Sequence, residues 1–359
     1  MKYYIEVGTV NKAKQDIDEI CRREGFTNLT RHNFGSGGLG RFMTKLASVT
    51  SILWTLKKGD TLFLQYPMKK FYYMACSLAK MKGAHVVTVI HDLGAFRRHK
   101  LTPEGENSRL SKTDFIIAHN PTMRHYLVEH GFKGGIHCLQ IFDYLSPHPL
   151  PPAQSGTQAT GTTTPAQWRI VYAGNLGRWR NEFLYRLEPV MKGWRLDLYG
   201  KGFDPANGDG QHATDTALAY HGFIDSDDFI ATAGGDRQAP PQFGLVWDGD
   251  SLDECTGDWG EYLRINDPHK TSFYLRAGIP VIVWKQAAMA PFIEEQRVGI
   301  AIDGISQLTA VLSHLTPGDY AQMRRNALNM GRRLNDGYYI KKGLEAAEAY
   351  LSATNNTIA

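Results

Sequence analysis

The sequence predicts two doubly wound α/β domains in tandem, and three observations carry this prediction. Residues 1–142 alternate apolar strand-like segments with helical ones, which is typical of a parallel sheet covered by helices on both sides. A stretch rich in Pro, Thr, Gly, Ala and Gln interrupts the pattern over residues 143–168 and reads as a linker. The alternation restarts at residue 169 and continues to residue 335. A last helix over residues 336–359 is a candidate to pack back on the first domain.

Each half contains six segments that we expect to form strands. Those of the first half are Tyr3–Val7, Asn28–Asn33, Thr61–Gln65, Val86–Ile90, Phe115–Ala118 and Gly135–Leu139. Those of the second half are Ile170–Ala173, Leu196–Tyr199, Tyr220–Phe223, Gly244–Trp247, Val281–Trp284 and Ile300–Ile302. Helices are expected over Lys12–Glu24, Gly40–Lys58, Asn181–Leu187, Pro317–Leu334 and Ile340–Ser352. Because ligands of such sheets bind beyond the carboxyl ends of the strands, we expect the site in a cleft between the two domains.

Charge is distributed unevenly along the chain. The formal net charge is +4, with about +10 in residues 1–142 and about −6 in the remainder. This pattern indicates an anionic partner for the first half or, equally, a solubility pattern. Residues 68–82 mix lysines with aromatic side chains, so this segment is a candidate for contact with an anionic membrane surface; a packed helix with solvated lysines is the alternative.

Four dispersed cysteines suggest buried thiols of a cytoplasmic protein, not a disulfide framework or a metal site. The first residues read as a strand and not as a signal peptide, and no apolar segment is long enough to span a bilayer. We expect no metal, no cofactor and no nucleic-acid partner, and we leave a homo-oligomer open.

Residues 264–284 carry the strongest pattern for a binding site. Asp267 suits the N-cap of a helix and Pro268 its first position. The free N–H groups and the dipole of this helix terminus attract anions, and Lys270 and Thr271 add an ammonium and a hydroxyl. The combination suits a diphosphate, whereas a solvated lysine on an ordinary helix is the alternative.

Two glycine turns extend this candidate site. Gly174, Asn175 and Arg178 follow a buried strand, where glycine lets the backbone approach a phosphate and arginine clamps it with fork geometry. Tyr199 and Gly200 end the next strand and are candidates for the nucleoside pocket. Arg178 as an ordinary solvent-facing arginine is the alternative.

Polar residues at two further strand ends are candidates for chemistry. His91 and Asp92 follow a strongly apolar strand; Asp92 is placed to act as a general base and His91 to bind a sugar hydroxyl, although Asp92 could merely cap the next element. Asp248 and Asp250 resemble a metal-binding pair, but no other acidic cluster supports a metal.

A glycine-rich motif gives a weaker signal. Residues 35–40 match a dinucleotide fingerprint with Asp60 beyond it, but they follow a polar segment. We prefer a mobile glycine loop at the mouth of the cleft over an NAD site.

Together, the tandem α/β halves and the segments KAKQDI, VIHDLGAFR, YAGNLGR, FGLVWDGD and NDPHKTSFYLRAGIPVIVW resemble GT-B glycosyltransferases. More narrowly, they resemble the bacterial family of galactofuranosyltransferases and of glucosyltransferases that act on glycosylated serine-rich adhesins. The resemblance implies that the second domain binds a UDP-sugar and the first binds the acceptor. It implies that Arg178 and Lys270 lie at the diphosphate and Tyr199 near the nucleoside. The donor site that we expect comprises Gly174, Asn175, Arg178, Tyr199, Gly200, Asp248, Asn266, His269, Lys270, Thr271 and Tyr274.

The expected activity is transfer of a hexosyl unit (galactofuranose, glucose or galactose) to a saccharide acceptor in cell-surface glycan or glycoprotein synthesis. Many retaining GT-B enzymes carry two glutamates where this chain has Tyr262 and His269, which favours inversion. A lipid-linked acceptor and a peripheral place on the membrane are candidates. A nucleotide-sugar epimerase, which consumes donor without acceptor, and a non-catalytic scaffold subunit remain as alternatives.

Overall fold

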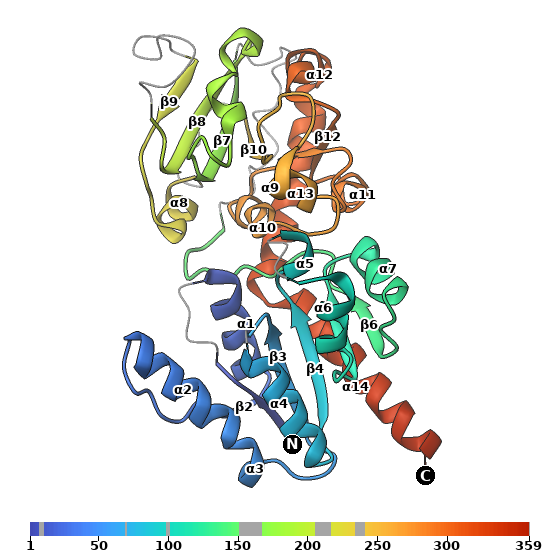
Figure 1. The fold of residues 1–359 in the computed structure, drawn as a ribbon. Helices are drawn as coiled ribbons and strands as arrows, with labels where there is room; N and C mark the ends of the chain where they lie inside the picture. The colour runs from blue at the N-terminus through green and yellow to red at the C-terminus, as the bar shows by residue number, and fades with distance from the viewer. Residues whose placement is uncertain are drawn as a thin grey trace. The chain divides into compact units, whose positions relative to one another are not determined.

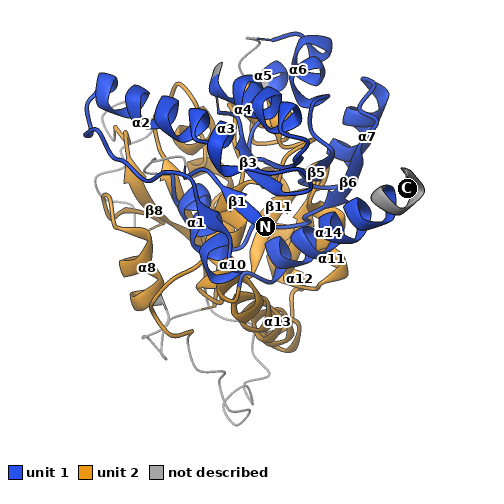
Figure 2. Cartoon of the chain, turned by 90° about the horizontal axis from the view of Figure 1, so that it is seen from below, with its two compact units in different colours: residues 1–143, 337–359 blue, residues 144–336 orange. Residues whose placement is uncertain are grey.

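The structure is a computed structural model that describes residues 1–6, 11–68, 70–97, 101–150, 167–204, 217–233 and 241–358 (Figure 1). The chain divides into two compact units (Figure 2). Unit 1 comprises residues 1–143 and 337–359, and unit 2 comprises residues 144–336. The last helix therefore belongs to unit 1. Most of the expected linker, residues 151–166, lies outside the described residues, as does Val7.

Unit 1 is built on a six-stranded parallel sheet in the order β2-β1-β3-β4-β5-β6. Its strands are β1 (Lys2–Tyr4), β2 (Thr27–Asn28), β3 (Thr61–Tyr66), β4 (His85–Ile90), β5 (Phe115–Ala118) and β6 (Gly135–Cys138). Its helices are α1 (Lys12–Arg23), α2 (Gly38–Thr50), α3 (Ile52–Thr55), α4 (Lys70–Met81), α5 (Gly94–Arg97), α6 (Pro103–Leu110), α7 (Pro121–Glu129) and α14 (Tyr338–Ile358). The strand order reverses between β1 and β3, which is where such sheets bind ligands.

The helix α14 packs closely on the sheet of unit 1. A Cβ added to Gly343 would lie 2.8 Å from Cδ1 of Ile117, so glycine permits the approach. The ring of Tyr350 lies 5.4 Å from that of Phe115. At the start of the helix the carboxylate of Asp143 accepts the backbone N–H groups of the second and third residues, and burial raises the pKa of Asp143 to about 7.

Unit 2 is built on a second six-stranded parallel sheet, in the order β12-β11-β10-β7-β8-β9. Its strands are β7 (Trp168–Asn175), β8 (Trp194–Lys201), β9 (Leu218–Tyr220), β10 (Gln242–Val246), β11 (Val281–Trp284) and β12 (Gly299–Ile302). Its helices are α8 (Ser226–Ala233), α9 (Gly257–Tyr262), α10 (His269–Arg276), α11 (Ala290–Glu295), α12 (Leu308–His314) and α13 (Pro317–Asn335), with 3-10 turns η1 (Glu182–Tyr185), η2 (Glu188–Val190) and η4 (Ile305–Gln307). Here the order reverses between β7 and β10.

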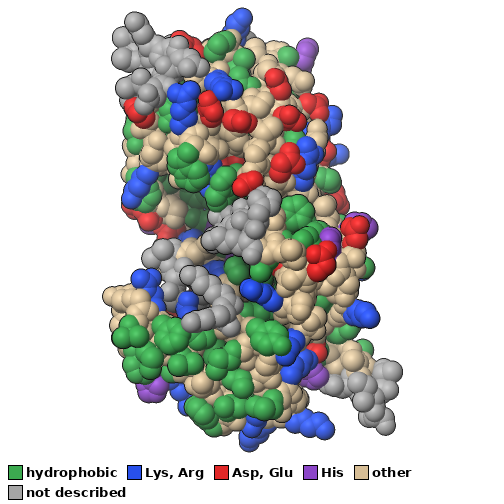
Figure 3. Space-filling view, in the orientation of Figure 1, with side chains coloured by type: hydrophobic (Ala, Val, Ile, Leu, Met, Phe, Trp, Pro, Cys, Tyr) green, Lys and Arg blue, Asp and Glu red, His purple; other side chains and the backbone are tan. Residues whose placement is uncertain are grey.

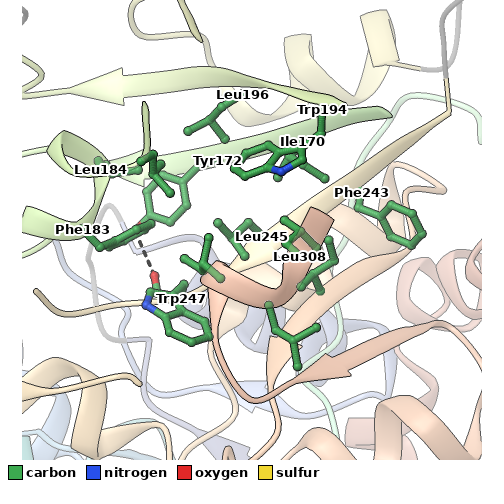
Figure 4. Close-up of a cluster of buried hydrophobic side chains, with 14 of the residues drawn as sticks. Ile170, Tyr172, Phe183, Leu184, Trp194, Leu196, Phe243, Leu245, Trp247 and Leu308 are labelled. Carbon is green, nitrogen blue, oxygen red and sulfur yellow. Dashed lines mark hydrogen bonds between the residues drawn. The ribbon is translucent and has the colours of Figure 1, made fainter. Parts of the chain in front are cut away.

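A large aromatic and aliphatic core holds the elements of unit 2 together (Figure 4). Trp194, Trp247 and Trp284 are each almost completely buried. The hydroxyl of Tyr172 donates to the carbonyl oxygen of Trp247 at 3.1 Å and so joins β7 to the end of β10. This bond fixes the strand ends at the reversal point, where the candidate site lies.

The predicted fold class is confirmed, whereas several element boundaries were wrong. The expected helix over Gly40–Lys58 is two helices, separated by Ser51. The expected helix over Asn181–Leu187 is only the 3-10 turn η1. The helix α10 begins at His269 and not at Pro268, because Pro268 takes extended angles and stands at the N-cap without a capping side chain. The expected strand Asn28–Asn33 is limited to Thr27–Asn28.

Asp60, which the dinucleotide fingerprint would have required, has a different role. Its carboxylate accepts the N-terminal ammonium of Met1 at 2.7 Å and the backbone N–H of Lys57 at 2.8 Å. It therefore fixes the start of β1 instead of facing a ribose.

Candidate functional site

Two glycines shape the carboxyl ends of β7 and β8. Gly174 and Gly200 are paired across the strands and have φ angles of 144° and 148°. A Cβ on Gly200 would lie 1.9 Å from the carbonyl oxygen of Gly174, which no side chain permits. The side chain of Asn175 accepts the N–H of Gly177 at 2.9 Å and closes the loop that follows β7. The result is a tight backbone surface beside the reversal point of the sheet.

Lys270 lies directly over this surface. It stands in the first turn of α10, and its Nζ lies 3.9 Å from the centroid of the Tyr172 ring. A Cβ on Gly174 would approach Cε of Lys270 to 3.6 Å, so the lysine stem crosses the glycine. Burial lowers the pKa of Lys270 to about 8; Asp248 opposes this shift and Arg180 adds to it. A cation held here without full solvation is prepared to bind an anion.

Arg180 is the second cation of this site, and the sequence alone did not reveal it. Its Nε donates to Oδ1 of Asp248 at 3.1 Å, and its guanidinium lies 3.8 Å from the centroid of the Trp259 ring. Asp248 is buried and also accepts from the hydroxyl of Tyr172 at 3.4 Å. Two cations thus surround one carboxylate at the ends of β7 and β10.

Arg178 lies in a different environment. Its Nη2 is 3.4 Å from Oε1 of Glu182, and its guanidinium is 5.6 Å from the centroid of the Tyr185 ring. Glu182 also pairs with Arg186 at 2.8 Å. The structure therefore associates Arg180, and not Arg178, with Lys270.

Thr271 and Tyr274 are buried supports in this structure and do not line an open site. The hydroxyl of Thr271 donates to Sδ of Met289, and that of Tyr274 accepts the backbone N–H of Ala173 at 2.7 Å. Neither side chain is exposed. Direct contact of these two side chains with the donor stays a prediction, since both are engaged in buried contacts here. They hold α10 against the sheet and so place Lys270.

The other expected donor residues lie on surrounding elements. Tyr199 is half-buried, stacks on His221 at 4.6 Å between ring centroids, and accepts from Arg169 at 3.0 Å. His269 stacks on Tyr144 at 4.8 Å. The side-chain oxygen of Asn266 is buried and has no hydrogen-bond partner among the described residues, so it is available to a ligand or a water.

In unit 1, His91 and Asp92 follow β4 as expected. Nε2 of His91 lies 2.7 Å from Oε1 of Gln65, whose amide nitrogen donates to Asp18 and to the carbonyl of Lys14. Since the amide nitrogen is used in this way, Nε2 of His91 carries the proton and donates. The imidazole also stacks on Phe142 at 5.4 Å. The ring is therefore fixed in orientation and in tautomer.

Lys14 is a further charged group near Asp92. It is buried, its Nζ donates to the carbonyl of Pro67 at 3.1 Å, and burial lowers its pKa to about 8. Asp92 is the first of the neighbouring charges that oppose this shift. Asp92 therefore shares its surroundings with a buried cation.

Glu106 supports the loop that carries Asp92. This buried carboxylate accepts the hydroxyl of Tyr66 at 2.7 Å and the N–H groups of Gly94 and Ala95 at 2.7 and 3.0 Å. The loop after β4 is thus tied to α6.

We expect Glu106→Gln to destabilise the protein by about 1–3 kcal/mol, because the new amide group would face a donor at a buried position. Urea denaturation measures the change. Glu104→Gln, an exposed position on the same helix, is the matched control and should change stability by only a few tenths of a kcal/mol, about the size of a helix-terminus charge effect. Equal urea midpoints for wild type and Glu106→Gln would contradict the role of Glu106 as the buried acceptor that holds the loop after β4.

Within the described part of the chain, no group of three or more His, Cys, Asp or Glu side chains is placed to hold a metal ion. Asp248 is directed at Arg180, and Asp250 accepts the hydroxyl of Thr256. No described helix is both long and apolar enough to cross a bilayer.

Comparison with known proteins agrees with this architecture. The family model "Glucosyltransferase 3-like, N-terminal domain" matches residues 3–141, and the model "Glucosyltransferase 3-like, C-terminal domain" matches residues 170–347. The chain is 30% identical over 338 residues to "Beta-1,6-galactofuranosyltransferase WbbI" of Escherichia coli K12, covering 93% of this chain and 92% of that one. It is 24% identical to "Glucosyltransferase 3" of Streptococcus gordonii over 343 residues, covering 92% of each chain.

Solved structures with the same fold include a sucrose-phosphate synthase from Thermosynechococcus elongatus and a glycosyltransferase from Rickettsia africae. The first has a TM-score of 0.62 at 13% identity and covers 99% of this chain and 100% of that one. The second has a TM-score of 0.51 at 12% identity and covers 98% and 99%. At these identities the likeness shows the fold alone. Together with the two matched domains, it confirms the resemblance to GT-B enzymes, and the chain belongs to the Glucosyltransferase 3-like family of glycosyltransferases.

Proposed function

We propose that this protein transfers a hexosyl unit from a UDP-sugar to a saccharide acceptor during synthesis of a cell-surface glycan or glycoprotein. The observation that carries the proposal is the pair of cations, Lys270 and Arg180, at the reversal point of the unit 2 sheet. A diphosphate is the part of a nucleotide-sugar that such a pair recognises. The names of the two relatives supply galactofuranose and glucose as the first sugars to test.

The same cations have a role in the reaction. Negative charge develops on the departing UDP as the sugar–phosphate bond breaks, and cations fixed in advance stabilise that charge. The N-terminus of α10 adds its own partial positive charge beside Lys270. Protein groups alone can therefore stabilise the leaving group.

On the acceptor side we propose that Asp92 is the general base and that the reaction inverts the anomeric configuration. We assign to His91 the binding of a sugar hydroxyl; the contacts that hold its ring against Gln65 and Phe142 support this assignment. A lipid-linked acceptor and a peripheral place on the membrane belong to the same proposal.

A donor screen tests this function. Thermal unfolding would be measured with a panel of UDP-, GDP- and TDP-sugars, because a ligand that binds the folded state raises its stability. We expect UDP-galactofuranose, UDP-glucose or UDP-galactose to give the largest shift, followed by UDP release that depends on acceptor. Sugar consumption without acceptor would instead indicate an epimerase, and absence of any shift would favour a scaffold subunit.

The pKa of Lys270 predicts how donor binding depends on pH. In the free protein the lysine loses its proton near pH 8, and a bound diphosphate favours the charged form. UDP affinity should therefore fall as pH rises from 7 to 9. The fall should be at most about tenfold, because at one pH unit above the pKa about one lysine in ten still carries its proton. Calorimetry at pH 7, 8 and 9 measures this, with Lys270→Met as the control whose affinity should stay flat. A wild-type affinity that is constant over this range would contradict it.

A further inference from the structure

One face of unit 1 exposes large apolar side chains on the three helices α2, α3 and α4 and on the loop before α2, and we call it the α2–α4 face. Its exposed members are Phe34, Leu39, Met43, Trp54, Tyr73 and Met81. Leu39, Trp54 and Met81 are the most open, at 76%, 72% and 67%. Hydrophobic side chains gather over this region in Figure 3, with basic ones beside them. An exposed patch with this many large apolar side chains is typical of an interaction site.

The spacing of these side chains places them in two stripes, one along α2 and its continuation α3 and one along α4. Leu39 and Met43 are one turn apart on α2, and Trp54 follows eleven residues later, which is three turns. Ser51, between α2 and α3, keeps helical backbone angles and so continues the path. Tyr73 and Met81 stand eight residues apart on α4.

The two helical paths belong to a single surface because they pack on each other. The rings of Phe42 and Phe71 lie 5.4 Å apart and join α2 to α4. Both paths also lie side by side in Figures 1 and 2. The two stripes therefore lie on neighbouring, packed elements, and the ring of Tyr73 also lies 4.2 Å from Nζ of Lys112.

The charge of this region is strongly one-sided. From Gly25 to His91 the sequence has nine Lys and Arg and a single carboxylate, Asp60. That carboxylate is already paired with the N-terminal ammonium of Met1. Exposed basic residues of the region include Arg31, Arg41, Lys57 and Lys58. The face thus combines apolar groups that can leave water with cations that attract an anionic surface.

We propose that the α2–α4 face docks on a bilayer that contains anionic phospholipid, with Leu39 and Trp54 entering the headgroup region. A second copy of this chain fits less well, because it would bring two surfaces of the same sign together. Tryptophan and long apolar side chains beside lysines are the groups that settle at this boundary. The inference rests on the proposed function, whose peripheral place on the membrane it assigns to one face of unit 1, and it would bring unit 1 to a lipid-linked acceptor.

Vesicle flotation with the full chain tests the charge requirement. We expect binding to phosphatidylcholine vesicles that contain phosphatidylglycerol, loss of binding at high salt, and little binding to phosphatidylcholine alone. Lys57→Glu should weaken the partition about tenfold or more, since it changes the charge by two units at about 1 kcal/mol per charge. Lys133→Glu, an exposed lysine of unit 1 outside this face, is the matched control and should change it far less. Equal losses in the two variants, or no binding at low salt, would overturn the proposal.

Trp54 gives a direct test of insertion because it is the single tryptophan in the sequence of unit 1. Brominated phospholipids should quench part of the protein's fluorescence, and Trp54→Phe should remove that quenching. Val128→Ser, at an exposed apolar position of α7, should leave both quenching and partition unchanged. Quenching that persists in Trp54→Phe would show that Trp54 does not enter the bilayer. A dimer that Trp54→Ser dissociates would show that a second copy of the chain, and not a membrane, covers this face. Calorimetry measures the UDP affinity of the same variants and so tests the donor site independently. A failure of the membrane proposal can therefore be told apart from a failure of the proposed function.

Discussion

Asp92→Asn is expected to bind the UDP-sugar nearly as wild type does while transfer falls by roughly 10²–10⁴-fold, the usual worth of a general base. The acceptor hydroxyl is a poor nucleophile at neutral pH, so a base must take its proton as the new bond forms. Asp92 follows the buried strand β4, and the loop after it is held by Glu106. Asparagine keeps the shape of the side chain and removes its basicity. Single-turnover transfer and UDP calorimetry together measure the two quantities.

Asp303→Asn is the matched control for this substitution. Asp303 is an exposed carboxylate that lies 3.4 Å from Lys285 and belongs to neither candidate site. The variant Asp303→Asn should therefore leave transfer and donor binding unchanged. Near-normal turnover in Asp92→Asn would end the assignment of Asp92 as the base. A product that retains the anomeric configuration of the donor would reject the inverting mechanism on which the assignment depends.

The fold could be predicted from the sequence because burial on both faces of a parallel sheet leaves a strong pattern. Val281–Trp284 is an uninterrupted apolar run and Val86–Ile90 is apolar except for Thr88, and both strands lie inside their sheets. Boundaries were less predictable where local and tertiary preferences compete. Asp267 is a good capping residue in isolation, yet it is buried, and the extended Pro268 moves the helix start to His269.

The choice between Arg178 and Arg180 shows what the sequence could not supply. The two arginines stand two residues apart in a loop without periodicity, so no pattern indicates which one turns toward Lys270. The partners that decide it, Asp248 and Trp259, come from far along the chain. Only the folded arrangement of these elements places them beside Arg180.

Tyr274 shows the same limit on a helix. It stands one turn after Lys270, so spacing alone puts both side chains on the ligand face. The structure turns Tyr274 into the sheet because Gly244 leaves room for its ring; a Cβ there would lie 2.2 Å from the ring. The absence of a side chain on β10 thus decides the role of a tyrosine on α10, and a single sequence does not reveal this pairing.

Lys270→Met is expected to weaken UDP binding by about 1–3 kcal/mol, which is roughly five- to 150-fold in affinity. Methionine keeps the length of the side chain over Tyr172 and removes only the charge. Arg180→Met should have an effect of the same size, but it also removes the ion pair that the buried Asp248 makes with Arg180. Arg180→Lys therefore accompanies it, since lysine keeps the charge while losing the fork geometry. Thermal unfolding of each variant confirms that the fold is intact.

Arg178→Met is the matched control, because Arg178 lies in the same loop and its charge is satisfied by Glu182 at an exposed position. UDP affinity in this variant should stay within about twofold of wild type, as for exposed ion pairs. If Arg178→Met weakened binding as much as Arg180→Met, the loop would have to rearrange on binding to bring Arg178 to the diphosphate. Unchanged affinity in Lys270→Met would remove the donor site from the reversal point of the unit 2 sheet.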